Sequence, residues 1–355
     1  MTFTAAERDA MASALGAAGR GVRGANPLVG AVVLDAGGSV LATGHHRGAG
    51  TPHAEAAALA ALGPVPRSAA GELTMVVTLE PCNHTGRTGP CAVAIAESGI
   101  GRVVYAVADG TDRAAGGAEY LASRGVRVEA GLLADEARAL NRRWFAARGA
   151  GRPFTTLHLA QTLDGRIAAA DGTSQWITGP DARRHSHGVR ALAEAIVVGT
   201  GTVLADDPRL TARDGDGTPL PRQPLRVVMG RRDVPAAAAV RGDGRWTQVR
   251  TRSPADVLRE LAARGIDHAM IEGGAGIATA FLAEDLVDEL WLYQAPLLLG
   301  AGRPAVGDLG IGTLRDAVRW APDDAGGPSH QRLGDDIALH LTPMPRAGLS
   351  AAGGA

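Results

Sequence analysis

The chain has only two cysteines, and both follow a His-Ala-Glu triplet. His53 and Glu55 come first, then Cys82 directly after Pro81, and then Cys91. A catalytic zinc takes three protein ligands and keeps its fourth position open for water. His53, Cys82 and Cys91 supply that number of ligands and predict a zinc site, with Glu55 free to carry protons beside it. The fold is constrained accordingly, because segments far apart in the chain have to meet at one ion.

The sequence around these residues predicts a helix, a strand and a second helix. Residues 54–62 form an apolar run that follows Thr51-Pro52 and ends at Gly63, which is typical of a helix. Residues 73–79 have the pattern of a strand that leads to Cys82, and Cys91 opens a short helix. The positive end of a helix lowers the pKa of a thiol, which favours the thiolate that a metal requires.

The residue types and their order are those of zinc deaminases. In these enzymes the metal activates a water molecule that attacks an amino-bearing ring carbon, and a glutamate transfers the protons. Glu55 is predicted to take that role, and the predicted chemistry is hydrolytic deamination. Eight residues separate Cys82 from Cys91, whereas the general pattern has two. A structural pair of thiols therefore remains an alternative.

The length and the local composition predict two domains. A chain of 355 residues exceeds the usual size of a single core. Alternating strand and helix patterns predict an α/β sandwich over residues 1–147. Residues 148–153 are small, basic and rich in glycine and proline, as in a linker. We expect a second α/β domain at residues 154–345 and a disordered tail at residues 346–355.

Charge and composition argue against several kinds of partner. The formal net charge is -1 and aromatic residues make up 3% of the chain, so neither a basic field nor stacking platforms favour nucleic acid. We find no basic leader with an apolar segment and no apolar stretch of membrane-spanning length. A metal explains the two cysteines better than an oxidising compartment does. We therefore expect a cytoplasmic protein that acts on small molecules, and we leave a homo-oligomer open.

Two predicted strands of the second domain end in glycine-rich turns. Residues 195–198 lead into Gly199-Thr200-Gly201, and residues 269–272 lead into Gly273-Gly274-Ala275-Gly276 and a helix. Such turns bring backbone N–H groups close to phosphate. They indicate a nucleotide pyrophosphate, although neither has the full spacing of the Rossmann fingerprint.

Longer motifs give the chain a resemblance to a known family. Residues 46–55 (HRGAGTPHAE) and 83–90 (NHTGRTGP) resemble the deaminase half of the bifunctional riboflavin-biosynthesis enzyme. Residues 162–165 (TLDG), 174–178 (SQWIT) and 272–274 (EGG) resemble its reductase half. The resemblance covers nearly the whole chain. It implies a cytidine-deaminase-like α/β/α sandwich followed by a dihydrofolate-reductase-like α/β domain, with zinc and NADPH as cofactors.

The resemblance also implies roles for individual residues. It assigns His53, Cys82 and Cys91 to zinc and Glu55 to proton transfer. The residues that it implies for the pyrimidine and its ribose phosphate are Asn26, His46, His84 and Arg87. Those implied for NADPH are Ala160, Trp176, Thr202, Asp206, Gly273, Gly274, Ala275, Gly276, Ile277, Ala278, Thr279 and Ala280. Those implied for the substrate of the reductase are His158, Ser174, Arg190, Leu210, Arg213 and Glu272.

The physical reasons for assigning these residues to the reductase site differ in strength. Arg190 and Arg213 each present a guanidinium fork that suits a sugar phosphate, whereas the core explains Leu210 equally well. His158 stands where the family usually has lysine, so a group that titrates near neutral pH replaces a fixed cation. We therefore expect reduction to slow as the pH rises. We expect Arg231 to bind the 2′-phosphate that distinguishes NADPH from NADH, with a solvated Arg231-Arg232 pair as the alternative.

The predicted function combines two reactions of riboflavin biosynthesis. The first domain is expected to hydrolyse an amino group of 2,5-diamino-6-(5-phosphoribosylamino)pyrimidin-4-one. The second is expected to reduce the ribosyl side chain of 5-amino-6-(5-phosphoribosylamino)uracil to ribityl with NADPH. One alternative is a nucleoside or tRNA deaminase with an unrelated C-terminal domain. Another is a zinc-stabilised binding protein without turnover.

Overall fold

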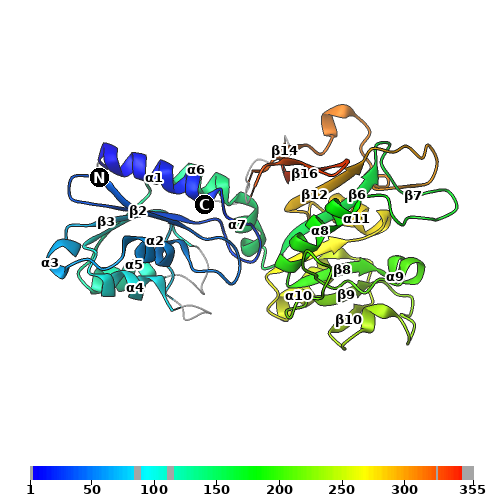
Figure 1. Cartoon of the computed structure of the whole chain (residues 1–355), viewed down its shortest axis with the longest axis horizontal. Coiled ribbons are helices and arrows are strands. Elements are labelled where there is room, and N and C mark those ends of the chain that lie inside the picture. Colours follow the sequence, from blue (N-terminus) through cyan, green and yellow to red (C-terminus); the bar gives the residue numbers. More distant parts are fainter. Residues whose placement is uncertain (1–2, 84–88, 110–115, 325–326, 346–355) are drawn as a thin grey trace. The chain divides into compact units, whose positions relative to one another are not determined.

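A computed structural model of the chain describes residues 3–83, 89–109, 116–324 and 327–345. The chain divides into two compact units, which are Met1–Ala146 with Ala325–Gly327 and Ala147–Asp324 with Pro328–Ala355. Figure 1 traces the chain through both. The expected tail lies outside the described residues, and the expected domain and linker boundaries stay predictions.

The first unit is built on a five-stranded sheet. In spatial order its strands are β2 (Val40–His45), β1 (Gly30–Leu34), β3 (Thr74–Leu79), β4 (Arg102–Val107) and β5 (Arg127–Ala130). β1 pairs antiparallel with both neighbours, and β3, β4 and β5 are parallel. β1 is buried along its whole length, as its unbroken apolar sequence predicts for a strand covered on both faces.

Helices cover both faces of this sheet (Figure 1). On one face lie α1 (Ala5–Ala18) and α6 (Ala134–Leu140). On the other lie α2 (Ala54–Leu62), α4 (Cys91–Ser98) and α5 (Gly117–Ser123). Two further helices are α3 (Arg67–Ala70) and α7 (Arg142–Gly149). The first unit is therefore the expected α/β/α sandwich.

Two glycines allow helices of the first unit to approach the sheet closely. A Cβ at Gly30 would lie 2.0 Å from the carbonyl oxygen of Ala14 in α1. A Cβ at Gly44 would lie 2.3 Å from the backbone nitrogen of Ala58 in α2. A side chain at either position would force the helix away from the sheet. Gly44 thereby positions α2 and the residue at its N-cap, His53.

The second unit contains a nine-stranded sheet. Along its main path the order is β10 (Trp246–Val249), β9 (Leu225–Met229), β8 (Ala195–Gly199), β11 (His268–Glu272), β6 (Phe154–Thr162), β12 (Glu289–Ala295), β16 (Asp336–Pro343) and β14 (Trp320–Pro322). Neighbouring strands from β10 to β12 are parallel. β16 is antiparallel to β12, and both β14 and β15 (His330–Leu333) are antiparallel to β16. β7 (Arg166–Ala168) and β13 (Arg303–Pro304) form a separate ribbon.

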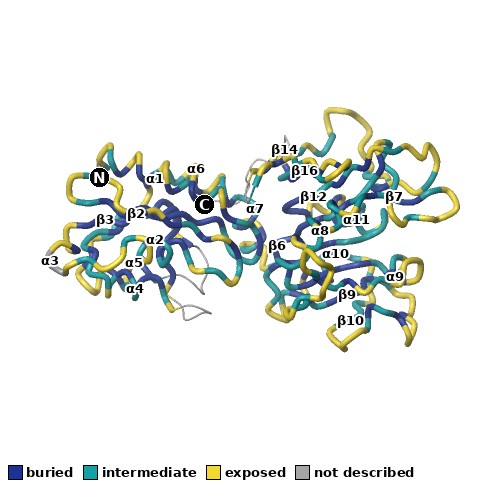
Figure 2. The backbone as a smooth tube through the Cα atoms, in the orientation of Figure 1, coloured by how far each residue is buried: buried dark blue, intermediate teal, exposed yellow. Residues whose placement is uncertain are grey.

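Two apolar cores lie on opposite faces of this sheet. One includes Leu258 from α10 (Pro254–Ala263) and Phe281 from α11 (Ala275–Ala283). The other includes Val189 from α8 (Pro180–Leu192) and Val203 from α9 (Thr200–Asp206). Successive residues of β11 alternate between them, with Ile271 in the first core and Met270 in the second. Figure 2 shows buried residues concentrated in the strands. The short helices η1 (Ala239–Arg241) and η2 (Leu314–Asp316) complete the unit.

Parallel pairing places the carboxyl ends of β8, β9, β10 and β11 at one edge of the sheet. The segments that follow these strands are therefore neighbours, although they are distant in sequence. Ligands of open α/β sheets bind at this edge. Within the described ranges, no helix is both long and apolar enough to cross a membrane.

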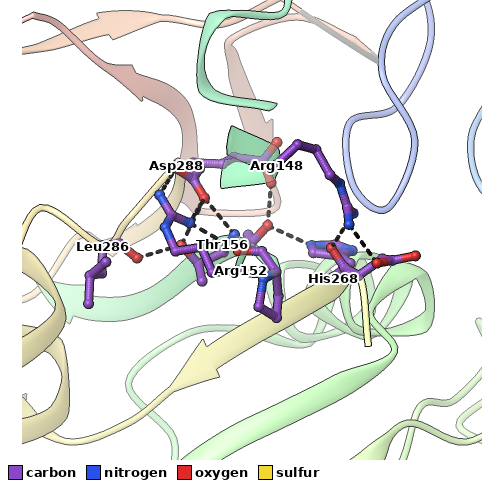
Figure 3. A network of polar contacts seen from close by, with 10 residues as sticks. Arg148, Arg152, Thr156, His268, Leu286 and Asp288 are labelled. Atoms are coloured by element: carbon purple, nitrogen blue, oxygen red, sulfur yellow. Dashed lines mark hydrogen bonds and ion pairs between the residues drawn. The ribbon is translucent and has the colours of Figure 1, made fainter. Parts of the chain in front are cut away.

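Two arginines from the segment predicted to be a linker are held by ion pairs (Figure 3). Arg152 donates to both carboxylate oxygens of Asp288, at 2.6 and 2.9 Å. Asp288 is buried and also accepts the backbone N–H of Thr155 at 2.9 Å. Arg148 lies 2.6 Å from a carboxylate oxygen of Asp267. Both arginines therefore anchor the start of the second unit to its sheet.

Candidate functional site

Three segments of the first unit bring His53, Cys82 and Cys91 together. His53 is the N-cap of α2, Cys82 follows β3, and Cys91 is the first residue of α4. Nδ1 of His53 lies 3.6 Å from Sγ of Cys82 and 3.4 Å from Sγ of Cys91. The three ligand atoms all lie within 4.8 Å of one another. The predicted ligands therefore converge on one point.

The charges of this cluster favour a cation at its centre. Hydrogen bonding with Cys91 lowers the pKa of Cys82 to about 4, while hydrogen bonding with Cys82 raises the pKa of Cys91 and of His53. Both shifts favour a thiolate at Cys82 next to the His53 ring. A dication allows both thiols to ionise, and one nitrogen with two sulfurs is a donor set that zinc prefers. These residues fit zinc.

Glu55 lies beside the cluster in the first turn of α2 and is 4% exposed. Burial raises the pKa of its carboxyl group to about 7. The carboxyl group also hydrogen-bonds with the side chain of Cys91. Glu55 is thus close enough to the ligands to exchange protons with a water molecule at their centre.

His46 and Asn26 border the same cluster. Nδ1 of His46 lies 3.0 Å from the carbonyl oxygen of Pro52, and Nε2 lies 3.0 Å from Nδ2 of Asn26. A carbonyl oxygen only accepts, so Nδ1 carries the proton and Nε2 accepts from the amide. The His46 ring stands edge-on to His53, with ring centroids 5.5 Å apart. The two other predicted residues, His84 and Arg87, lie outside the described residues.

A cavity of about 780 Å³ lies in the second unit. It is lined by all six residues that are predicted to bind the reductase substrate: His158, Ser174, Arg190, Leu210, Arg213 and Glu272. It is also lined by six of those predicted for NADPH: Ala160, Trp176, Thr202, Asp206, Gly273 and Gly274. Leu210 belongs to an apolar core as well. The fold thus gathers these distant residues around one volume.

Polar and aromatic groups line part of this cavity. The Ser174 hydroxyl donates to a carboxylate oxygen of Asp206 at 3.3 Å. Trp176 is 67% exposed, and the guanidinium carbon of Arg183 lies 4.5 Å from the centroid of one of its rings. An exposed aromatic ring at a cavity is suited to contact a flat ligand.

Arg190 is already engaged in the cavity wall. Its Nε and Nη2 donate to the two carboxylate oxygens of Glu272 at 2.8 and 2.7 Å, and its Nη1 donates to the carbonyl oxygen of Thr211 at 2.9 Å. The expected two-point grip of Arg190 on a sugar phosphate is therefore not available in this arrangement. Arg213 donates to the Thr211 hydroxyl at 3.0 Å and, within the described part of the chain, forms no ion pair. Arg213 is the better candidate for a phosphate.

His158 is neutral at physiological pH. Nε2 lies 2.8 Å from the Ser186 hydroxyl, and the ring centroid lies 4.9 Å from that of Tyr293. Burial lowers the pKa of His158 to about 4, and the charge of nearby Glu272 only partly opposes this effect. The expectation that His158 titrates near neutral pH is wrong because desolvation dominates. The expected slowing of reduction with rising pH loses its basis.

A second cavity of about 560 Å³ lies over the glycine-rich turns that follow β8 and β11. The predicted NADPH residues that line it are Arg231, Ala275, Gly276, Ile277 and Ala280. Thr202 and Gly274 border both cavities. Two predicted residues line neither of them. Ala278 is fully buried, and the Thr279 hydroxyl donates to the carbonyl oxygen of Ala275 at 2.6 Å.

Sequence reasoning missed several residues that line these cavities. Arg252 follows β10, and the signal that points to it is the parallel register of β10 beside β9, which is not readable from local composition. Arg303 lies in the two-residue strand β13, and we find no sequence pattern that predicts it. Tyr293 has a buried side chain and no local motif.

Comparisons with known proteins match both halves of the chain. Residues 5–107 match the cytidine and deoxycytidylate deaminase zinc-binding region, and residues 153–325 match the RibD C-terminal domain. The chain is 45% identical over 317 residues to the riboflavin biosynthesis protein RibD of Mycobacterium tuberculosis, which covers 89% of this chain and 90% of that protein.

Solved structures agree with these matches. The structure of Acinetobacter baumannii RibD, form 1, has a TM-score of 0.73 and 33% sequence identity, and covers 96% of this chain and 99% of that chain. A deaminase/reductase from Thermotoga maritima has a TM-score of 0.70 and 29% identity, with the same two coverages. The predicted fold class is confirmed in both halves, and a deaminase with an unrelated C-terminal domain is not favoured. The chain belongs to the RibD family of bifunctional riboflavin-biosynthesis enzymes, in which a zinc-binding deaminase domain is joined to a reductase domain that uses NADPH.

Proposed function

We propose that the chain catalyses two consecutive steps on a phosphorylated pyrimidine. The first is the hydrolytic deamination of 2,5-diamino-6-(5-phosphoribosylamino)pyrimidin-4-one. The second is the reduction of 5-amino-6-(5-phosphoribosylamino)uracil to its ribityl form. The similar Thermotoga maritima protein is a diaminohydroxyphosphoribosylaminopyrimidine deaminase and 5-amino-6-(5-phosphoribosylamino)uracil reductase, which supports this choice of substrates. The observation that carries the proposal is the convergence of His53, Cys82 and Cys91 beside buried Glu55.

In the deamination step, His53, Cys82 and Cys91 would hold zinc, which would supply the Lewis acidity that makes water nucleophilic at neutral pH. Glu55 would accept a proton from the attacking water and deliver it to the departing ammonia, which keeps the charge in this buried site balanced. His46 holds the Asn26 amide through a hydrogen bond of 3.0 Å and so orients it toward the pyrimidine. His84 and Arg87 complete the proposed set of substrate contacts.

In the reduction step, the chain binds and orients two molecules. NADPH supplies the hydride, so the protein's task is placement and electrostatics. The turns after β8 and β11 would approach the pyrophosphate, since their glycines carry no side chains that would keep it away. Ser174 and Asp206 offer hydrogen bonds to sugar hydroxyls, and Arg213 offers a cation to the substrate's phosphate. The charge of Glu272 is neutralised by Arg190, and Glu272 remains a polar group in the wall of the cavity.

A single purified sample tests both steps. We expect bound zinc, ammonia release from the diaminopyrimidine, and NADPH oxidation with the deaminated product. Glu55→Gln is expected to lower ammonia release by about 10³-fold while zinc content and NADPH oxidation stay at the wild-type level. Glu97→Gln is the matched control because Glu97 is exposed on α4. Ammonia release at the wild-type rate by Glu55→Gln would refute the proton-transfer role.

The reductase site has its own test. Arg213→Gln is expected to raise the KM for the phosphorylated substrate and to change kcat little, because a phosphate contact binds the ground state and the transition state alike. An unchanged KM would exclude Arg213 as the phosphate ligand. We also propose that the protein is cytoplasmic, and light scattering after size-exclusion chromatography tests for a homo-oligomer.

A further inference from the structure

The second cavity carries a concentration of positive charge. Arg231, Arg232, Arg252 and Arg303 line it, all four are exposed, and no Asp or Glu is among its lining residues. Within the part of the chain that the structure describes, none of the four forms an ion pair with a carboxylate. Four uncompensated guanidinium groups around one cavity favour a ligand with several negative charges.

The backbone that carries Arg231 and Arg232 is held in place by the neighbouring strand. Nε2 of Gln248 donates to the carbonyl oxygens of Gly230 and Arg232 at 2.8 and 2.7 Å. Nη1 of Arg250 donates to the carbonyl oxygen of Arg231 at 3.0 Å, and Arg250 also pairs with Asp233. The Arg250 side chain therefore contacts the loop itself. The backbone that carries Arg231 and Arg232 is therefore already fixed, and a ligand does not have to order it on binding.

The strand order assigns these arginines to different parts of the cavity. Arg232 lies against the turn after β8, since a Cβ at Gly201 would lie 3.3 Å from its Nη2. Arg231 follows β9, and Arg252 follows β10, which is the next strand outward. β9 and β10 are parallel with Met229 beside Val249, so both arginines leave the sheet at the same edge. Arg231 and Arg252 therefore lie beyond the glycine turns, on the outer side of the cavity.

We propose that Arg252, together with Arg231, binds the 2′-phosphate of NADPH, and that Arg252 determines the preference for NADPH over NADH. This inference rests on the proposed reductase function. If the pyrophosphate lies on the glycine turns, the adenosine ribose extends toward β9 and β10. A phosphate monoester offers two charges and three oxygens, which suit two guanidinium forks. NADH has a hydroxyl at this position and leaves both guanidinium groups without a counter-charge, so the pair discriminates between the cofactors.

Binding of two cofactor fragments tests the assignment without catalysis. The full chain is titrated with 2′,5′-ADP and with 5′-AMP, and dissociation constants are measured by displacement of NADPH fluorescence at fixed salt. Wild type is expected to prefer 2′,5′-ADP. Arg252→Gln is expected to weaken 2′,5′-ADP about tenfold or more, the range for a hydrogen bond to a charged group, with little change for 5′-AMP. Arg252→Lys keeps the charge but loses the fork, so we expect an intermediate effect.

The control is Arg259→Gln, because Arg259 is exposed on α10 and pairs only with Asp256 among the described residues. It should leave both constants unchanged. The inference is overturned if Arg252→Gln weakens both fragments equally or leaves their ratio at the wild-type value. A wild type that binds NADPH but shows no preference for 2′,5′-ADP overturns this inference alone. A wild type that binds no NADPH overturns the proposed reductase function with it.

Discussion

Arg190 and Glu272 form a two-point ion pair in the wall of the large cavity, with N–O distances of 2.8 and 2.7 Å. Both side chains are 13% exposed. Burial alone raises the pKa of the Glu272 carboxyl group, but the charge and hydrogen bonds of Arg190, together with nearby His158 and His187, outweigh it, so the pKa lies below its usual value. The pair places a carboxylate at the cavity without leaving an uncompensated charge there.

Arg190→Met is expected to lower the free energy of unfolding of the second unit by about 3 kcal/mol, because Glu272 remains as a partly buried charge without its partner. The double variant Arg190→Met/Glu272→Met should recover most of this loss. Urea unfolding followed by tryptophan fluorescence measures it, since four of the five tryptophans lie in the second unit. Equal losses in the single and double variants would contradict the pairing.

The lowered pKa of His158 predicts that the folded protein loses stability in acid. Its pKa is about 4 in the folded protein, against an ordinary value of 6.5. Above pH 6.5 both folded and unfolded chains hold it neutral. Between pH 6.5 and 4 only the unfolded chain binds the proton, so stability falls as the pH falls, by about 3 kcal/mol in total.

His158→Gln should flatten this dependence, because glutamine cannot take up the proton. Urea unfolding at a series of pH values from 7 to 4 measures the slope. His330→Gln is the control, since His330 is exposed on β15. If the His158→Gln profile has the same slope as wild type, His158 does not contribute to the acid sensitivity.

Removal of zinc is expected to separate the two activities. A chelator should abolish ammonia release and leave NADPH oxidation with the deaminated substrate intact, because His53, Cys82 and Cys91 all lie in the first unit. Cys91→Ser should lower the zinc content as well, since it removes one of the thiolates. Metal analysis paired with both assays checks this, and ammonia release from a metal-free sample would contradict it.

The two arginines in Figure 3 provide a matched comparison of ion pairs. Arg152 faces Asp288, whose side chain is 0% exposed, whereas the side chains of Arg148 and Asp267 are 21% and 30% exposed. Arg152→Gln should cost about 3 kcal/mol, because it removes the cation that donates to both oxygens of the buried carboxylate. Arg148→Gln should cost about 1 kcal/mol or less. Chemical denaturation of both variants measures the difference, and equal losses would show that burial does not set the cost.

The predicted zinc ligands show how far a linear sequence can predict a site. His53, Cys82 and Cys91 were identifiable because zinc requires particular donor atoms, and each donor lies at the start of a helix or shortly after a strand, where the local pattern is strong. The glycine turns after β8 and β11 were identifiable for a similar reason, since glycine before a helix is a local signal. Ala278 and Thr279 share that segment but line neither described cavity, because helix geometry turns them toward the core and toward Gly307.

The amino-acid sequence by itself determined the α/β class and predicted the zinc donor set with Glu55, because these depend on residue type and short-range order. The residues predicted for the reductase substrate came from longer motifs that resemble a known family, and they line the large cavity. Only the tertiary structure decided that the Arg190 guanidinium pairs with Glu272, that burial keeps His158 neutral, and that Arg252 lines the same cavity as Arg231. These properties arise from desolvation and from the pairing of strands distant in sequence, and neither is encoded in the residues next to the one concerned.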